Sequence, residues 1–524
     1  MEGPQVVVLV GACLLLGGVL SARLHVASPL VLLLLGVLAG ALLGALPGST
    51  AVELPPEVVL LLFLPALLYW ESITTSLREI RADLRGIVLL AVGLVLLTAV
   101  AVAAVGHAVG LPWPVAFTLG AVVAPTDATA VAGVAGRLPR RTLTTLRAES
   151  LINDGTALVV YALAVEAATG ARHVGLGEVA WRLPVSYAGG LLLGLSTAVV
   201  VLVVRRWLLE PRLENVLSVL IPFLAYLPAE ELDVSGVVAV VSCGLLLSQA
   251  TPRVISARTR VQAEGFWQLT AYILNGALFV LVGLELRPVL SSSDVALLPA
   301  LRDVLLVTLV VVGTRLLWIS TVPLLVGVLD RRPEHRLRRV RARQRAPVAW
   351  AGFRGAVSLA AALALPEDVA GRDRIVLITF GVILLTLLVQ GLSMPAVVRW
   401  ARLPEDVDVQ DEQALVEREA TLAGLAAVDV RAAQLLSPPE VVDRVRTAYQ
   451  SRLARLEARG EAGAEQDEQD EQAEDRLRLA LLADKRAAVV RLRDGRRIDD
   501  TVLRWVQARL DVEEVRLATP GPSE

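Results

Sequence analysis

The sequence predicts an all-α membrane protein whose chain crosses the bilayer about thirteen times. Three observations predict this fold. Hydrophobic residues make up 55% of the 524 residues, which is more apolar surface than a soluble core of this length usually buries. They gather in runs of about 20 residues, the length that a helix needs to span a bilayer. The loops between these runs alternate between basic and acidic.

The expected spans follow one another with short connections. They cover residues 4–22, 28–46, 54–72, 86–109, 113–136, 146–168, 183–204, 214–230, 234–250, 265–286, 303–329, 346–366 and 375–400. The first run lacks the basic residues that begin a signal peptide, so we interpret it as a span rather than a cleaved leader. The eighth is short, which predicts a tilted or partly interfacial helix.

Basic residues mark every second loop. Arginines cluster after the odd-numbered spans, most densely from Arg331 to Arg345, whereas acidic residues prevail after the even-numbered spans. Loops rich in arginine stay on the cytoplasmic side of a membrane. The N-terminus is therefore expected outside and, because the number of spans is odd, the C-terminus is expected inside.

The composition changes after the last span. We predict that residues 1–403 form a membrane domain and that residues 404–524 form a helical cytoplasmic tail, because the second part has no spanning run and is rich in charged residues. Its stretch from Glu461 to Glu474 is strongly acidic, which favours a charged helix or a disordered link. A multi-pass protein of the cytoplasmic (inner) membrane is expected.

Cysteine and histidine are few and scattered. The two cysteines, Cys13 and Cys243, lie inside apolar runs, and the four histidines show no metal-ligand spacing. We therefore predict no disulfide framework, no resident metal and no other cofactor. The chain also has no Walker-type GxxxxGK[ST] sequence, no TVGYG-like filter and no His/Glu or Ser/His pair at helical spacing within the spans. An enzyme is not expected, and a channel and a membrane-embedded enzyme are the less favoured alternatives.

The fifth span contains an acid beside a proline. An ionisable side chain at the centre of a membrane costs about 2.5–3.5 kcal/mol, so the few that occur there point to function. Asp127 lies in GAVVAPTDATAV, two residues after Pro125. Proline removes a backbone donor and frees a carbonyl. We expect an interrupted helix whose carbonyls face a cation. The alternative is a simple kink in which Asp127 bonds a neighbouring helix.

The sixth span carries the segment ESLINDGT at residues 149–156. Helical spacing places Glu149 and Asn153 on one stripe, and Ser150 and Asp154 on the next. At 1.5 Å per residue, Asp154 lies near mid-membrane. A carboxylate there binds either a small cation or a proton, and competition between the two for one anionic site is the physical requirement for exchange. Glu149 fits better as a structural acid that an arginine neutralises.

Two arginines and a further acid also lie in apolar spans. Arg354, flanked by glycines in the twelfth span, needs an anionic partner, and we predict that this partner is Glu149. We interpret Arg315 in the eleventh span as a compensating charge for helix ends at a break. Glu71 closes the third span after two aromatic residues, where it either marks the interface or belongs to a site.

Three motifs occur in order on the fifth, sixth and twelfth spans: APTDATAV, ESLINDGTALVVY and FRGAVSLA. Together they resemble the monovalent cation:proton antiporter-1 family, which includes the bacterial NhaP-type and the animal sodium/proton exchangers. The resemblance covers the chain from about residue 5 to residue 400. It implies inverted repeats, fifth and twelfth helices that are unwound where they cross, a mobile core and a dimerisation domain, and hence a homodimer.

The resemblance also implies roles for single residues. The acid at the position of Asp154 binds the cation or the proton in the family, and Asn153 belongs to an Asn-Asp pair that marks electroneutral exchange. Further positions match the crossing or the ion ligands of the family, and these are Thr126, Asp127, Ser150 and Glu71. The resemblance also implies the pairing of Glu149 with Arg354.

The function expected from residues and resemblance is secondary antiport of Na⁺, or Li⁺, against H⁺ by alternating access. Because Asn153 carries no charge, one monovalent cation would replace one proton on Asp154, and no net charge would move. A K⁺/H⁺ antiporter on the same fold is an open alternative, and a cation channel is the less favoured one. The expected partners are these ions, a second copy of the chain and the lipid bilayer, without nucleic acid.

Overall fold

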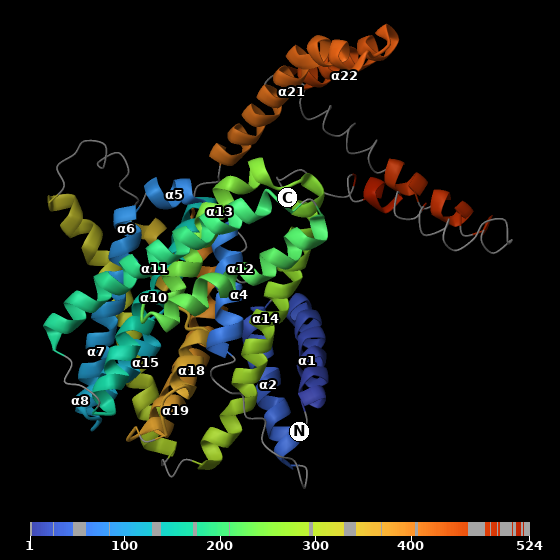
Figure 1. The fold of residues 1–524 in the computed structure, drawn as a ribbon. Coiled ribbons are helices and arrows are strands. Elements are labelled where there is room, and N and C mark those ends of the chain that lie inside the picture. Colours follow the sequence, from blue (N-terminus) through green and yellow to red (C-terminus); the bar gives the residue numbers. More distant parts are fainter. Residues whose placement is uncertain are drawn as a thin grey trace. The chain divides into compact units, whose positions relative to one another are not determined.

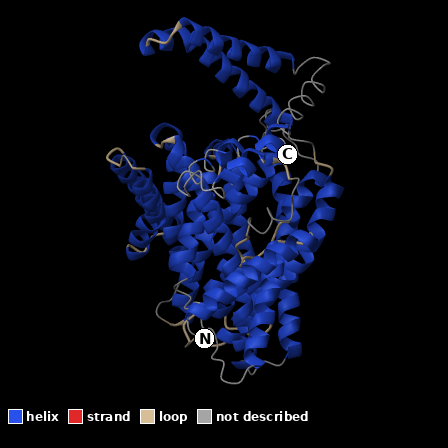
Figure 2. Ribbon diagram, turned by 90° about the vertical axis from the view of Figure 1, so that its right-hand side faces the viewer, coloured by secondary structure: helices blue, strands red, loops and turns tan. Residues whose placement is uncertain are grey.

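The structure is a computed structural model that describes eleven long stretches of the chain. These are residues 3–24, 26–45, 59–82, 84–127, 138–170, 175–208, 210–292, 297–329, 342–367, 369–403 and 407–458, with short pieces between 477 and 517. Every regular element within these stretches is a helix (Figure 2). The chain divides into two compact units, Met1–Pro404 and Glu405–Glu524.

The first unit is built from helices that fall in the expected spans (Figure 1). In chain order they are α1 (Gly3–Leu24), α2 (Ser28–Ala45), α4 (Leu64–Thr74), α7 (Leu94–Ala108), α8 (Trp113–Val123), α10 (Arg140–Ala168), α11 (Leu176–Arg205), α12 (Pro211–Glu231), α13 (Gly236–Val254), α14 (Ala257–Ser292), α15 (Leu297–Leu329), α17 (Ala346–Trp350), α18 (Ala356–Leu363), α19 (Arg372–Leu385) and α20 (Gly391–Ala401). Shorter elements connect or extend them: η1 (Val59–Phe63), α5 (Leu77–Ala82), α6 (Leu84–Val88), η2 (Leu89–Gly93), η3 (Ala342–Arg345) and η4 (Thr386–Gln390). Each expected span contains helix, which confirms the all-helical prediction, while the number and direction of the crossings remain predictions.

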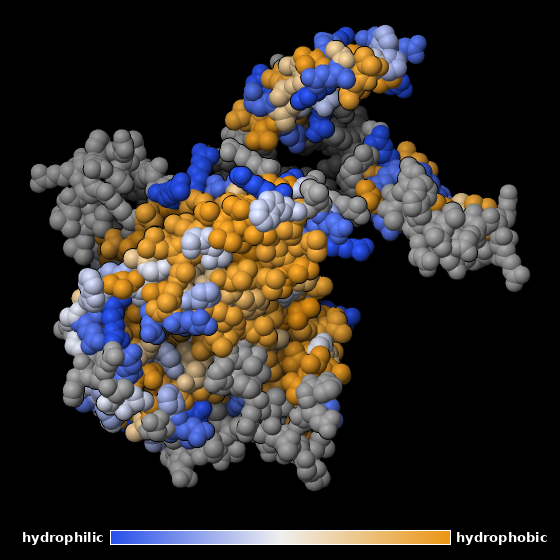
Figure 3. All heavy atoms as spheres, viewed as in Figure 1, coloured by the Kyte–Doolittle hydropathy of each residue, from blue (hydrophilic) through white to orange (hydrophobic). Residues whose placement is uncertain are grey.

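The outer surface of these helices is apolar. Eight helices in the described part of the chain are long and apolar enough to cross a membrane, and four shorter apolar helices accompany them. Large apolar side chains such as Leu15, Leu192 and Leu309 are exposed, and Figure 3 shows apolar side chains spread over the visible face of the helices. Water does not favour so large an apolar surface, whereas the hydrocarbon of a bilayer does.

Two groups of helices can be distinguished by their packing. In the first, α10 packs mainly on α8, α8 on α7, and α15 on α7 and α19. In the second, α13 packs on α11, α4 and α12. We call the first set (α7, α8, α10, α15, α18 and α19) the α10 group and the second set (α4, α11, α12 and α13) the α13 group. The contact of α10 with α11 and α13 is smaller than its contact with α8, so this side of α10 is a boundary between the groups.

The fifth and twelfth spans are interrupted, as the sequence predicts. Helix α8 ends at Val123, and the chain is not helical from there to Asp127. The second interruption separates α17 from α18 at residues 351–355. The two unwound segments cross, because the backbone N–H of Asp127 donates to the carbonyl of Phe353 at 2.8 Å. This contact confirms the predicted crossing; the rest of the fifth span, from residue 128 to 136, lies outside the described residues.

The second unit contains a pair of packed helices, α21 (Val407–Leu435) and α22 (Pro439–Ala458). Arg446 of α22 joins them, since its guanidinium lies 2.5 Å from Asp429 of α21. It also lies 3.3 Å from Asp443 of its own helix. Both aspartates are exposed and Arg446 is partly exposed, and such pairs add little stability. The acidic stretch from Glu461 to Glu474 lies outside the described residues.

Candidate cation-binding site

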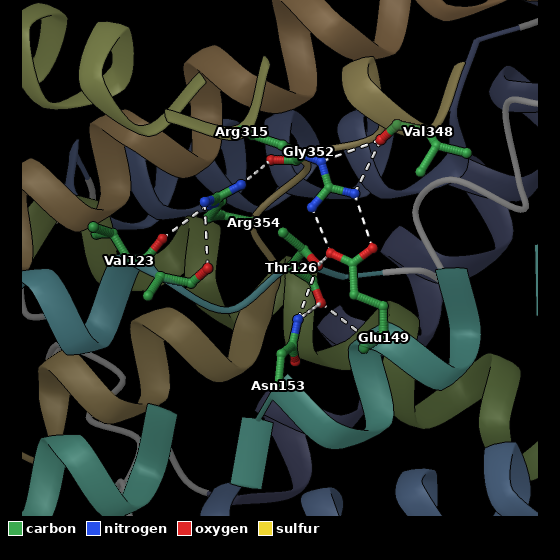
Figure 4. Close-up of polar contacts among 10 residues, drawn as sticks. Val123, Thr126, Glu149, Asn153, Arg315, Val348, Gly352 and Arg354 are labelled. Atoms are coloured by element: carbon green, nitrogen blue, oxygen red, sulfur yellow. Dashed lines mark hydrogen bonds and ion pairs between the residues drawn. The ribbon is translucent and has the colours of Figure 1, made fainter. Parts of the chain in front are cut away.

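The unwound part of the fifth span is fastened to α10 by a chain of hydrogen bonds (Figure 4). The side chain of Asn153 donates from Nδ2 to Thr126 Oγ1 at 2.9 Å, and Thr126 Oγ1 donates to Glu149 Oε1 at 3.2 Å. Ser150 Oγ donates to the carbonyl of Thr126 at 2.9 Å. All four side chains are buried. Glu149, Ser150 and Asn153, which helical spacing places on neighbouring stripes of α10, therefore all bond Thr126 in the unwound segment.

A cavity lies beside this junction. It leaves about 50 Å³ of room for water, and a single water needs roughly 10–15 Å³ by the same measure. The predicted site residues that line it are Glu71, Thr126, Asp127, Ser150 and Asp154. The structure thus places Glu71 at the cavity rather than apart from it. The space suits a few waters or one partly hydrated monovalent cation.

Two polar residues of the cavity were not singled out from the sequence. Asn275 of α14 and Ser358 of α18 also line it. Ser358 lies inside the motif FRGAVSLA, in which only Arg354 was predicted to have a role. Asn275 is an isolated amide in an apolar helix, and its sequence context carries no signal for a ligand.

Asp154 is the carboxylate of α10 that borders the cavity. Its side chain is buried, and within the described part of the chain no side chain donates a hydrogen bond to it. The charged groups that act on it most are two further acids, Glu71 and Asp127. No lysine or arginine occurs among the described residues that line the cavity. A buried carboxylate in such surroundings needs a proton or a bound cation to neutralise it.

Asp154 also borders a second, smaller cavity. This space has room for about one water, near 10 Å³, and lies beside Leu158, Tyr161 and Ala361. Its walls are largely apolar. Along α10, Ser150 and Asp154 line the larger cavity, whereas Asp154, Leu158 and Tyr161 line the smaller one. The carboxylate of Asp154 therefore lies between the two cavities. The larger cavity lies on the side of Glu71.

The predicted ion pair of Glu149 with Arg354 is wrong. Arg315 holds both oxygens of this carboxylate, with Nη1 at 2.5 Å from Oε1 and Nη2 at 3.0 Å from Oε2 (Figure 4). Both side chains are almost fully buried. The planar guanidinium matches a carboxylate in this two-bond geometry. Arg315 also donates to the carbonyl of Val348 from Nε at 3.2 Å, so it links α10 and α15 to the second interrupted segment.

Arg354 supports the two breaks instead. Its Nε donates to the carbonyl of Val123 at 2.8 Å, its Nη2 to that of Ala124 at 3.3 Å, and its Nη1 to that of Gly352. Carbonyls at a helix end lack partners within the helix and need other donors when they are buried. Arg315 was expected to compensate the helix ends, but this compensation is provided mainly by Arg354.

Gly355 leaves no room for a side chain where the segments cross. A Cβ atom at this position would lie 2.8 Å from Asp127 Cγ, closer than two carbons approach without displacement. We expect Gly355→Ala to push the two segments apart and to lower exchange about tenfold or more, because a small misplacement of reacting groups already has such an effect. Ion flux per purified protein measures it. Gly313→Ala on α15, where nothing lies within 4 Å of the added Cβ, is the matched control and should behave like the wild type.

A helical membrane protein with two crossed, unwound segments and buried carboxylates beside them has the architecture of an ion-coupled secondary transporter. The transmembrane sodium/hydrogen exchanger family matches residues 10–400, and the chain belongs to this family. It is therefore a transporter and not an enzyme.

Known relatives and a solved structure are similar to the chain. An uncharacterized Na⁺/H⁺ exchanger of Mycobacterium tuberculosis is 44% identical, covering 100% of this chain and 97% of its own. A sodium, potassium, lithium and rubidium/H⁺ antiporter of Bacillus pumilus is 30% identical over 68% of this chain and 56% of its own. The sodium proton antiporter MjNhaP1 of Methanocaldococcus jannaschii shares the fold, with a TM-score of 0.60 at 20% identity over 77% of this chain and 100% of that chain.

Proposed function

We propose that the chain exchanges Na⁺, or Li⁺, for H⁺ on the carboxylate of Asp154. The observation that carries this proposal is the position of Asp154: it is buried, lies between two cavities and has two acids rather than a cation as its charged neighbours. A proton and a small cation compete for such a group. Release of one is then a condition for binding of the other, which couples their movements.

The exchange is one cation for one proton, without net charge movement. Asn153, the neighbour of Asp154, supplies an amide instead of a second titrating group. Its Nδ2 is engaged by Thr126, while its Oδ1 is buried without a hydrogen-bond partner in the described part of the chain. That side chain holds the break in place and adds no charge to the transported load.

An aspartate at position 153 tests this stoichiometry. We expect Asn153→Asp to add a second carboxylate that titrates during the cycle, so that transport moves net charge and its rate responds to a membrane potential. Proteoliposomes with a potassium–valinomycin potential of either sign measure the response. The wild type should exchange at the same rate at both potentials, and a current or a voltage-dependent rate in the wild type would contradict the electroneutral mechanism.

The choice of cation has a second candidate. The relative from Bacillus pumilus is named for sodium, potassium, lithium and rubidium, which favours K⁺/H⁺ exchange as the alternative on this fold. Proteoliposomes loaded at low pH and diluted into Na⁺, Li⁺ or K⁺ distinguish the two. We expect proton release with Na⁺ and Li⁺; release with K⁺ alone would replace the first candidate by the second.

The setting of the exchange is also part of the proposal. The protein works in the cytoplasmic membrane as a homodimer, with its N-terminus outside and residues 404–524 forming a tail in the cytoplasm. The distribution of arginines between loops supports this orientation, and the family resemblance supports the dimer. The two cavities on either side of Asp154 support alternating access, in which one is open at a time.

A further inference from the structure

Tyr187 of α11 contacts α10 on both sides of Asp154. Its hydroxyl donates to the carbonyl of Ile152 at 3.0 Å and shares a hydrogen bond with Thr156 Oγ1, 2.6 Å away. Thr156 is fully buried. One side chain from another helix thus bonds the residue two positions before the exchanging carboxylate and the residue two positions after it.

Tyr187 lies on α11, which packs closely against α13. A methyl group at Gly190 or Gly194 of α11 would collide with the backbone of α13, so the two helices pack with their backbones in contact. The backbone N–H of Ser235, at the start of α13, also donates to the carbonyl of Ser186 at 3.3 Å. The residue before Tyr187 is therefore tied to α13, and the tyrosine moves with that helix.

The partner of Tyr187 belongs to the other group. Helix α10 carries Asp154 and is fastened to the unwound fifth span through Ser150 and Asn153. Near Tyr187, helix α10 packs closely against α13 through small and apolar residues. A Cβ on Gly155 of α10 would lie 3.3 Å from Val238 Cγ2 of α13. The hydroxyl bonds therefore cross a boundary along which small and apolar surfaces meet.

We propose that Tyr187 is a positioning residue that latches α10, with Asp154, in the conformation seen here and must release it in each transport cycle. In alternating access, one group of helices moves against another around the bound ion. Because Tyr187 is fixed to the α13 group and its partners lie on α10, this movement breaks both hydrogen bonds. The latch rests on the proposed function, since it acts on the carboxylate that exchanges the ions.

A reversible cross-link tests the release directly. With Cys13 and Cys243 replaced by alanine, Tyr187→Cys and Thr156→Cys are bridged by a bifunctional methanethiosulfonate long enough to replace the tyrosine ring. We expect the bridged protein to lose cation-driven proton flux and to regain it after reduction. The control pair, Leu14→Cys with Tyr272→Cys, joins α1 to α14 where the Tyr272 hydroxyl lies 3.4 Å from the Leu14 carbonyl, and it should transport equally well with and without the bridge. Undiminished flux through the bridged 156–187 pair would overturn the latch.

Removal of the hydroxyl alone tests the direction of the effect. A hydrogen bond of this kind contributes about a factor of five to an equilibrium. Because the hydroxyl makes two such bonds, Tyr187→Phe should reduce the population of this conformation by at least about fivefold. Apparent cation affinity then falls on the membrane face that this conformation serves and rises on the other. Everted and right-side-out vesicles measure the two faces. Tyr272→Phe is the matched control. Equal affinities on both faces before and after Tyr187→Phe would contradict the proposal, because a merely structural bond has no sidedness.

A double-mutant cycle assigns the effect to the contact itself. Thr156→Val removes the partner hydroxyl, and we expect the combination with Tyr187→Phe to shift the affinities less than the two single shifts multiplied. If the wild type shows no exchange with any cation, the proposed function fails. The latch is then judged by amide hydrogen exchange of residues 150–160: acceleration by at least about fivefold in Tyr187→Phe, but not in Tyr272→Phe, supports it, and unchanged exchange overturns it.

Discussion

Asp154→Asn should abolish cation-driven proton flux while leaving the protein folded. The amide that replaces the carboxylate neither takes up a proton nor offers a charge to a cation, so the site has nothing to exchange. Because the substitution removes a buried acid that no described side chain neutralises, we expect the midpoint of thermal unfolding in detergent to stay the same or to rise. Flux in vesicles and unfolding of the purified protein measure the two effects.

Glu214→Gln is the control for this loss. Glu214 of α12 is also a buried acid, with 8% of its surface exposed, but it does not line either cavity beside Asp154. Its substitution removes a carboxyl charge from the same membrane domain without touching the site. Flux equal to that of the wild type in this variant, together with none in Asp154→Asn, assigns the loss to the position and not to the change of charge.

The buried pair of Glu149 and Arg315 should have the largest effect on stability. Removal of one partner leaves the other charge buried and unpaired, which costs about 3–5 kcal/mol. We expect Glu149→Gln and Arg315→Met each to lower the free energy of unfolding by about this amount. Since each residue also positions a break, exchange should fall with the fraction of folded protein or faster. Denaturant unfolding in detergent gives the free energies, with urea as the denaturant.

The combination of these substitutions tests the corrected pairing. Glu149→Gln with Arg315→Met should cost clearly less than the sum of the two single effects, because the second change removes a charge that the first has already isolated. Glu149→Gln with Arg354→Met should be closer to additive, since Arg354 donates to the carbonyls of Val123, Ala124 and Gly352 instead. Strong coupling to Arg354 and none to Arg315 would restore the pairing that the sequence predicts.

The helices and the breaks could be predicted from local sequence. An apolar run in a membrane forms a helix, because each backbone N–H and C=O group must find its hydrogen-bond partner within the segment. Pro125 and the glycines around Arg354 mark the points where this pattern fails, and the structure has its two interruptions there. The importance of Asp154 could also be predicted from local sequence, because an acid midway along an apolar span is costly whichever helices pack around it.

The partners of the charged groups could not be predicted in this way. Glu149 has two buried arginines available, Arg315 on α15 and Arg354 in the interruption between α17 and α18, and helical spacing says nothing about which of them reaches it. The answer depends on how α15 and the second break pack against α10. Tyr187 escaped notice for a related reason: a single tyrosine in an apolar helix is an ordinary residue, and its importance arises from the backbone of α10 that lies opposite.

The function of Asp154 is tested most directly by cation-induced proton flux in everted vesicles from a strain that lacks its own antiporters. A pH-sensitive dye follows the collapse of a respiration-driven proton gradient when Na⁺, Li⁺ or K⁺ is added, with the wild type beside Asp154→Asn at equal expression. We expect the wild type to dissipate the gradient on addition of Na⁺ or Li⁺ and Asp154→Asn to leave it intact. Equal dissipation by both proteins would show that exchange does not pass through this carboxylate.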